Sequence, residues 1–384
     1  MAVENLITSL NGYNVRNNAL PSTDRVVSVD ALRGFDMFWI MGGDIGFQAL
    51  DNVFHNRFSA FLKVQFDHAE WFGFHFEDII MPLFLFLVGI SMAYSFRKRL
   101  CNVTSDKPLW KHTVKRVIIL WILGMVVQGN LLSYDIEKIE FFSNTLQAIA
   151  AGYLISTILI LYLPVTWQIL STTALLLIYW MLAALIPVGG TTVNAWLMQG
   201  NLPMYVDEVV LGQFRGWWHY AWIVPSLNFG ATTMLGVFAG YTMQSDSGQM
   251  KKLRNFVMVG VSLIIFGILL SIWQPVIKKI WTSSFVLFSG GICYLMLALF
   301  YLIIDVWGLR KGFKWMVVIG SNAIFAYVAW HLFEKSLRGV AEVFLKGLTL
   351  YLGNWTEVLS IFGGTLVLYL ILRVMHKHKI FVKI

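Results

Sequence analysis

The chain has 384 residues, of which 58% are apolar and only 13% are charged. This composition excludes an ordinary soluble domain, in which about a quarter of the residues are charged. The net charge of +8 could indicate nucleic-acid binding, but the sequence has no basic stripe with interleaved aromatic residues, so we expect no nucleic-acid partner. Many apolar runs are instead long enough to cross a bilayer, which takes about 20 residues per helix.

A polar segment, residues 1–24, precedes the first apolar run and is expected to form an N-terminal arm. Because lipid offers the backbone no hydrogen bonds, the apolar runs should be helices. The sequence therefore predicts an all-α polytopic bundle of about ten transmembrane helices, with residues 25–384 as a single domain. The predicted spans are 31–50, 76–96, 113–132, 143–163, 165–187, 226–244, 253–273, 283–306, 313–333 and 357–375.

The longest interruption between predicted spans is the loop 188–225. A structureless loop of this length is unusual, so we expect it to be functional or partly helical. Lys and Arg are enriched in cytoplasmic loops. An even number of spans with both termini in the cytoplasm puts most Lys and Arg there and the loop 188–225 on the other side. An odd count, with one span misread, is the alternative.

The first predicted span contains three ionisable residues, Arg33, Asp36 and Asp44. Such side chains are costly in hydrocarbon and usually mark a functional interior. Arg33 and Asp44 are eleven residues apart, so in a straight helix they share one face, about 16 Å apart along the axis. That geometry suits a long ligand lying along the helix, with snorkelling or paired charges as the alternative. We expect Asp36 to be a partner of Arg33 or of a neighbouring helix.

The segment 66–82 holds several carboxylates and histidines just before the second span. His68 could act as a general base or carry an acyl group, because histidine titrates near neutrality. A hydrogen-bonded rim histidine is the alternative. Asp78 could cap the helix or bond to a histidine. No helical His-x-x-x-His or Cys pattern supports a metal site, and we predict none.

The later spans add further polar candidates. Tyr327 and His331 are four residues apart and therefore neighbours on one helix face, and His331 could join His68 in one pocket. Gln147 could bind a polar ligand or a neighbouring helix. Basic clusters that include Arg116 and Lys314 are explained by topology, or they could hold the phosphates of a cytoplasmic cofactor.

Several blocks of the sequence resemble the heparan-α-glucosaminide N-acetyltransferase family. The first is the most specific, and the resemblance runs from about residue 25 to the C-terminus. The blocks are SVDALRGFD at 28–36, FDHAEWFG at 66–73, EDIIMPLFLFLVGIS at 77–91, LQAIAAGY at 146–153, SNAIFAYVAWHLFE at 321–334 and KIFVKI at 379–384.

The resemblance implies that acetyl-CoA enters from the cytoplasm and that its acetyl group passes to a terminal glucosamine on the other side. It places the family's catalytic histidine at His68, its pocket asparagine at Asp44 and its histidine of span nine at His331. The chain departs from the family pattern at Ala148, where an arginine is frequent, and at residues 224–227, where an acidic Asp-Pro-Glu-Gly run is frequent.

We therefore expect an acetyl-CoA-dependent amino-sugar N-acetyltransferase, a multi-pass protein of the bacterial inner membrane. His68 would be the general base, with Asp44 orienting it or binding the acceptor. Contacts to the acceptor are expected from His331, Asp78 and Tyr327. Contacts to acetyl-CoA are expected from Arg33, Arg116, Lys314, Gln147 and Asn322.

Two other functions remain open from the sequence. A secondary transporter of a small sugar or cation would use the aspartates as a proton relay or cation site. A glycan O-acetyltransferase would use the same base on a hydroxyl. Membrane lipid and a second copy of the chain, forming a homodimer, are the remaining expected partners.

Overall fold

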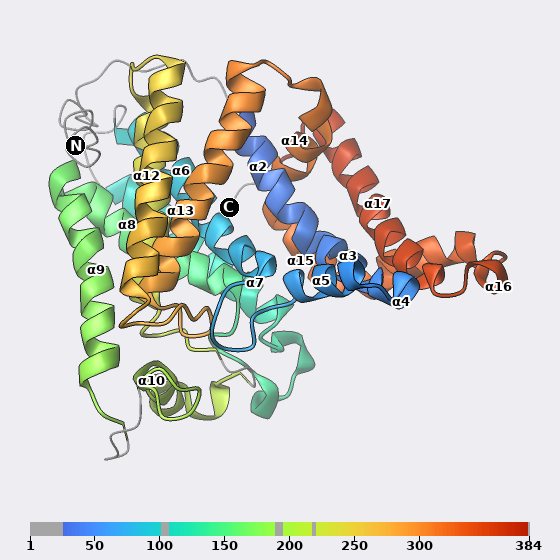
Figure 1. Ribbon diagram of the computed structural model, residues 1–384, viewed down its shortest axis with the longest axis horizontal. Helices are drawn as coiled ribbons and strands as arrows, with labels where there is room; N and C mark the ends of the chain where they lie inside the picture. The colour runs from blue at the N-terminus through green and yellow to red at the C-terminus, as the bar shows by residue number, and fades with distance from the viewer. Residues whose placement is uncertain (1–25, 101–106, 189–194, 217–219, 383–384) are drawn as a thin grey trace.

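The structure is a computed structural model that describes residues 26–100, 107–188, 195–216 and 220–382 (Figure 1). The predicted N-terminal arm, residues 1–24, lies outside the described residues. Within these ranges all regular secondary structure is helical, and the only β-type pairing is an isolated bridge between Phe142 and Arg215. The prediction of an all-α fold is confirmed.

The long helices form a bundle in which α9, α12 and α13 stand roughly upright in Figure 1, with α14, α15 and α17 along the opposite side. The helices of ten or more residues are α2 Val27–Phe38, α6 Ile80–Leu100, α7 Lys107–Val127, α8 Thr145–Tyr162, α9 Val165–Leu185, α10 Leu202–Leu211, α11 Ser226–Gln244, α12 Gln249–Leu270, α13 Ser283–Tyr301, α15 Ala323–Leu345 and α17 Trp355–Lys377. The shorter helices are η1 Trp39–Gly43, α3 Asp44–Ala49, α4 Asp51–Phe54, α5 Arg57–Gln65, η2 Phe76–Ile79, η3 Leu131–Ser133, η4 Ile136–Lys138, η5 Gly212–Phe214, η6 Leu302–Val306, η7 Lys311–Phe313, α14 Lys314–Gly320 and α16 Thr349–Leu352.

Six of the described helices are long and apolar enough to cross a membrane: α6 with η2, α8, α9, α12, α13 with η6, and α17. The pair α14 and α15, bent by 68°, makes a seventh if it is counted as one span. The chain is therefore a multi-pass membrane protein. The first, third and sixth predicted spans are not among these seven, so the count of ten stays a prediction.

The sixth predicted span is helix α11, which lies at the centre of the bundle. Every residue from Asn228 to Gln244 is buried, and α11 packs against α6, α8, α9 and α13. A helix surrounded by protein needs no lipid-compatible surface, because its polar side chains can bond to neighbouring helices. The abundance of Thr and Gly in α11 therefore agrees with its position.

Small residues set the contact between α11 and α6. Gly236 and Gly240 on α11 lie against α6, where Gly240 faces Ala93. A Cβ added at Gly236 would lie 1.9 Å from the carbonyl oxygen of Phe86 on α6. Small residues four apart let two membrane helices approach until their backbones touch. This contact brings α6, which directly follows η2, against the centre of the bundle.

The prediction of one straight helix over residues 31–50 is wrong. Helix α2 ends at Phe38 and continues into the π-helix η1, in which Met41 and Gly42 have non-helical dihedral angles. Gly42 has a φ of +97°, and a Cβ there would lie 2.5 Å from the ring of Trp330. A positive φ and this contact both require glycine. The hydroxyl of Thr365 donates to the carbonyl of Met41 at 2.6 Å and so satisfies a backbone group at the break.

The break changes the relation between the two ends of this span. The placement of Arg33 and Asp44 on one face, about 16 Å apart, assumed regular helical geometry between them. Because η1 intervenes, that placement no longer holds. Asp44 instead becomes the first residue of a separate short helix, α3.

The loop 188–225 is partly helical, as predicted, because it contains α10. In Figure 1, α10 lies below the lower end of the bundle. The buried carboxylate of Asp207 on α10 accepts hydrogen bonds from the backbone N–H groups of Trp222 (2.7 Å) and Ile223 (3.0 Å). These bonds tie α10 to the start of α11.

We predict that Gly236→Ala lowers the midpoint of thermal unfolding of the purified protein in detergent. The added Cβ would overlap the backbone of α6, and overpacking of this kind costs on the order of 1–3 kcal/mol. Gly248→Ala is the matched control, because a Cβ at Gly248 meets nothing within 4 Å. Equal midpoints for the two variants would contradict the close contact between α6 and α11.

Candidate functional site

A cavity of about 570 Å³ lies inside the bundle. Four residues singled out from the sequence line it together: Asp44 from α3, His68 from the loop before η2, and Tyr327 and His331 from α15. The prediction that His331 joins His68 in one pocket is confirmed. Lys278, from the loop before α13, lines the same cavity.

Asp78, in η2, lies behind His68 and holds it in place. Its carboxylate is fully buried, and Oδ2 accepts from the backbone N–H groups of His75 (2.9 Å) and Ala69 (3.3 Å). Oδ1 lies 3.2 Å from Nδ1 of His68 and 3.3 Å from Nζ of Lys278. Asp78 thus both caps the helix and bonds to a histidine. Its contacts are those of a residue that positions the imidazole, and it is not part of the cavity lining.

The imidazole of His68 lines the cavity, and the protein engages one of its two ring nitrogens, Nδ1. The side chain is 43% exposed, and it lines the cavity. Because Nδ1 lies 3.2 Å from the carboxylate of Asp78, Nε2 is the nitrogen left to meet a ligand. The ammonium of Lys278, 3.1 Å from Nδ1, then acts on the ring through its charge. The tautomer that donates Nδ1–H to Asp78 leaves Nε2 unprotonated, which is the form that a base or nucleophile requires.

Lys278 is the most important residue of the site that sequence analysis missed. Its side chain is almost fully buried, and Nζ lies 3.1 Å from Nδ1 of His68 and 3.5 Å from the carbonyl oxygen of Glu77. The ammonium of Lys278 is the main reason that the pKa of His68 lies below its usual 6.5, and desolvation lowers it further. Asp78 and Asp67 oppose this shift. Lys278 therefore favours the neutral imidazole.

Carboxylates from four elements reach the cavity, and sequence analysis identified only Asp44 among them. Glu77 of η2, Glu140 from the segment before α8 and Glu334 of α15 are the others. Glu77 lies within the segment 66–82, and no motif distinguishes it from the other carboxylates there. Glu140 and Glu334 lie far apart in the sequence and have no motif that marks them.

Tyr327 and His331 stack on each other at one wall of the cavity, with ring centroids 4.2 Å apart. Their predicted proximity on one helix face is confirmed. Nδ1 of His331 lies 2.9 Å from the carbonyl oxygen of Tyr327, so the ring donates Nδ1–H to it and keeps Nε2 as an acceptor. The hydroxyl of Tyr327 donates to Oε1 of Gln128 at 3.4 Å.

The two amide residues predicted to bind acetyl-CoA, Gln147 and Asn322, do not line the cavity. Gln147 donates to the carbonyl of Phe141 (2.7 Å) and accepts from the N–H of Ser143 (2.8 Å), so it shapes the segment before α8. Asn322 binds the C-terminal segment, with its Oδ1 accepting from the N–H of Val382 at 2.9 Å. Both amides are used by the fold.

The three cationic residues predicted to bind acetyl-CoA also lie outside the cavity lining. Arg33 donates to Asp30 (3.1 Å) and to the hydroxyl of Ser91 (2.7 Å). The guanidinium of Arg116 lies 4.6 Å from the ring centroid of Tyr153, on α8. Lys314 is exposed at the start of α14.

Asp36 does not pair with Arg33 through a hydrogen bond, contrary to one of the expectations for it. Its side chain is fully buried on α2, and neither carboxylate oxygen has a hydrogen-bond partner among the described residues. Asp30 takes the place beside Arg33 instead.

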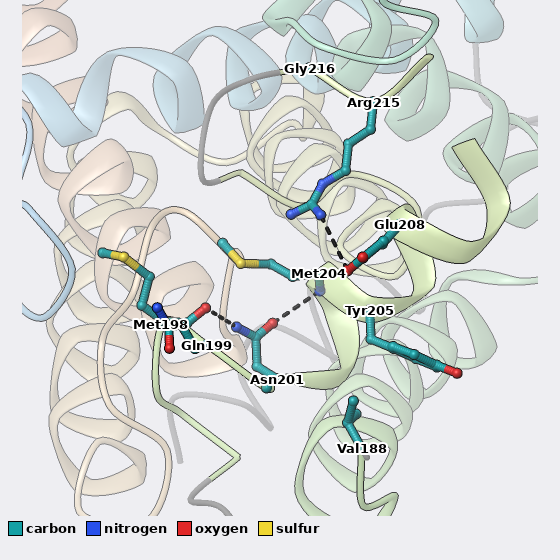
Figure 2. Close-up of a pocket in the computed structure, with 10 residues that line it drawn as sticks. Val188, Met198, Gln199, Asn201, Met204, Tyr205, Glu208, Arg215 and Gly216 are labelled. Atoms are coloured by element: carbon teal, nitrogen blue, oxygen red, sulfur yellow. Dashed lines mark hydrogen bonds and ion pairs between the residues drawn. The ribbon is translucent and has the colours of Figure 1, made fainter. Parts of the chain in front are cut away.

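A second cavity, of about 420 Å³, lies beside α10 (Figure 2). Glu208 and Arg215 face each other across 3.6 Å at one side, and Asn201, which caps α10, lies at another. Gly216 also lines this cavity, and a Cβ there would lie 2.6 Å from Oε2 of Glu140. Glu140 lines the larger cavity, so the two cavities have neighbouring lining residues at this point.

Residues 25–255 match the model of the family described as heparan-alpha-glucosaminide N-acetyltransferase, catalytic. The chain belongs to this family. The match includes Asp44, His68 and Asp78, whereas Lys278 and His331 lie beyond it. The heparan-alpha-glucosaminide N-acetyltransferase of Mus musculus is 23% identical over 330 residues, which cover 70% of this chain and 50% of the mouse protein. The chain thus spans about half the length of that relative.

We predict that Lys278→Met raises the pKa of His68. Removing the ammonium beside Nδ1 leaves Asp78 to stabilise the imidazolium, so a lower proton concentration suffices to charge the ring. Diethylpyrocarbonate reacts with unprotonated imidazole, and mass spectrometry of the peptide that contains His68 gives the rate against pH. The midpoint should move to higher pH in Lys278→Met and stay in place in Lys279→Met. An unchanged midpoint in the first variant would show that Lys278 does not control His68.

Proposed function

We propose that the protein transfers the acetyl group of acetyl-CoA to the amine of glucosamine or a related amino sugar. The observation that carries this proposal is the set of contacts around His68. A buried carboxylate binds its Nδ1, a buried ammonium lies beside the same nitrogen, and the side chain lines a cavity shared with Asp44 and His331. Membership of an N-acetyltransferase family supports the same chemistry.

The reaction needs a base because a sugar amine attacks only as the free amine. His68 would take a proton from the amine at Nε2, and the nitrogen would attack the carbonyl carbon of the thioester. The C–N bond forms, the C–S bond breaks, and CoA leaves as a thiolate. Starting from the ammonium form, the product keeps one proton on nitrogen, one goes to the thiolate, and one is released to solvent.

The other cavity residues suit binding of the acceptor. Because Asp78 already orients the imidazole, we assign Asp44 to the acceptor side. His331 retains Nε2 as an acceptor, which suits a sugar hydroxyl, and the ring of Tyr327 packs behind it. Asp78 would then influence the substrate only through His68.

We further propose that acetyl-CoA enters from the cytoplasm of a bacterial inner membrane, on whose cytoplasmic side both termini lie. Arg33, Arg116 and Lys314 would hold its phosphates, away from the reacting atoms, since none of the three lines the cavity. We do not include Gln147 or Asn322, whose amides are engaged in the fold. A homodimer and bound lipid remain predictions.

We predict that His68→Ala lowers acetyl transfer from labelled acetyl-CoA to glucosamine by about 10²–10⁴-fold, the usual contribution of general acid–base catalysis. The assay uses purified protein in detergent and separates labelled N-acetylglucosamine by chromatography. His378→Ala is the matched control, since His378 is exposed just after α17 and far along the chain from the cavity residues. Near-normal turnover in His68→Ala would refute the assignment.

The same assay separates the alternatives. An O-acetyltransferase would form an ester, which alkali cleaves and which leaves the amine free. A transporter would form no acetylated sugar and would move the sugar without acetyl-CoA. Either result would replace the proposed reaction.

A further inference from the structure

The cavity is lined by more acidic than basic side chains. Among the described residues that line it, four are carboxylates, Asp44, Glu77, Glu140 and Glu334, and one is a lysine, Lys278. The lysine is already paired, because its Nζ lies 3.3 Å from the carboxylate of Asp78, outside the lining. The positive charge of Lys278 is therefore already balanced by Asp78.

Glu77 is a carboxylate of the lining whose position is constrained by its backbone. It is 8% exposed, and it follows the N-cap of η2, so its backbone is fixed by the same turn that holds Asp78. Its carbonyl oxygen accepts from Lys278 at 3.5 Å. Its side chain lines the cavity, and its Oε2 is buried without a hydrogen-bond partner in the described part of the chain.

Asp44 reaches the same cavity from another element, α3, and its Oδ1 is likewise buried with no partner among the residues described. By contrast, Glu334 accepts a hydrogen bond from Arg338 at 3.1 Å. Glu77 and Asp44 are thus two acidic side chains, held on separate elements, that line one cavity and have unused acceptor atoms.

Buried carboxylates are costly unless a cation and hydrogen-bond donors compensate them. A ligand that enters the cavity can supply both. A primary ammonium carries one positive charge and three N–H donors, which matches two carboxylates with free oxygens. A hydroxyl brings no charge, and an ionised sulfate or phosphate brings negative charge and no donor.

We propose that Glu77 and Asp44 form an ammonium subsite, which selects a cationic amino sugar over a neutral sugar and over an amino sugar that carries an anionic group. This inference rests on the proposed function, because it concerns the acceptor of that reaction. It names Glu77 as a specificity-determining residue and the acceptor as an unsulfated, unphosphorylated amine.

Binding without acetyl-CoA tests the subsite separately from catalysis. The thermal unfolding midpoint of the purified protein is measured against increasing glucosamine, glucose and glucosamine 6-sulfate, and the concentration dependence gives each affinity. The measurement is made at a pH at which the amine of glucosamine is protonated. Glucosamine should bind at least about tenfold more tightly than the other two. Loss of a charged hydrogen-bond partner typically weakens binding by about 10- to 100-fold.

The decisive variant is Glu77→Gln, which keeps the shape of the side chain and removes its charge. It should weaken glucosamine binding by about 10- to 100-fold and bring glucosamine closer to glucose and to the 6-sulfate. Glu70→Gln is the control, because Glu70 lies in the preceding loop, is exposed and does not line the cavity. The unfolding midpoints without sugar check that both variants fold.

Three results are possible for the wild-type protein and this variant. A preference for glucosamine that Glu77→Gln abolishes supports the subsite. A preference that survives in a folded Glu77→Gln overturns the role of Glu77 and leaves the transferase intact. No binding of glucosamine by the wild-type protein, or equal binding of all three sugars, overturns the subsite, and absence of binding also removes the proposed acceptor.

Discussion

Asp78 carries a carboxylate at the start of a membrane helix, where water does not hydrate it. Such a group is strongly destabilising unless donors surround it. The backbone N–H groups of Ala69 and His75, the imidazole of His68 and the ammonium of Lys278 meet this need. These donors come from two loops that are about 200 residues apart in the sequence. Satisfying one buried charge therefore fixes the loop before η2, the loop before α13 and the histidine between them.

The rest of the cavity depends on where helices are interrupted and where they touch. The break at Gly42 allows Trp330, which lines the cavity, to pack against the backbone of the first span. The same break makes Asp44 the start of a new helix that faces the cavity. Gly236 lets α6 and α11 approach closely, so the helix that directly follows Asp78 and η2 rests on the buried helix α11. The helix break at Gly42 and the helix contact at Gly236 thus both help to shape the one cavity.

The sequence predicted the helices well, because continuous apolar runs leave few alternatives in a membrane. It also predicted that His68 and His331 would meet, since intramembrane polar residues gather in the bundle interior. It did not predict the break at Gly42, where a Gly-Gly pair inside an apolar run is compatible with a continuous helix. Lys278 was missed because its proximity to His68 arises only from tertiary packing. For amides such as Gln147, composition could not distinguish ligand binding from internal hydrogen bonding.

In the proposed mechanism, one cavity takes acetyl-CoA from one face of the membrane and the amino sugar from the other. It is tested most directly by supplying the two substrates on opposite sides of a membrane. Proteoliposomes are loaded with glucosamine, and labelled acetyl-CoA is added outside, with His68→Ala vesicles as the blank. We expect labelled N-acetylglucosamine to accumulate inside while the CoA moiety stays outside. Product that forms only when both substrates are on the same side would contradict transfer through the bundle.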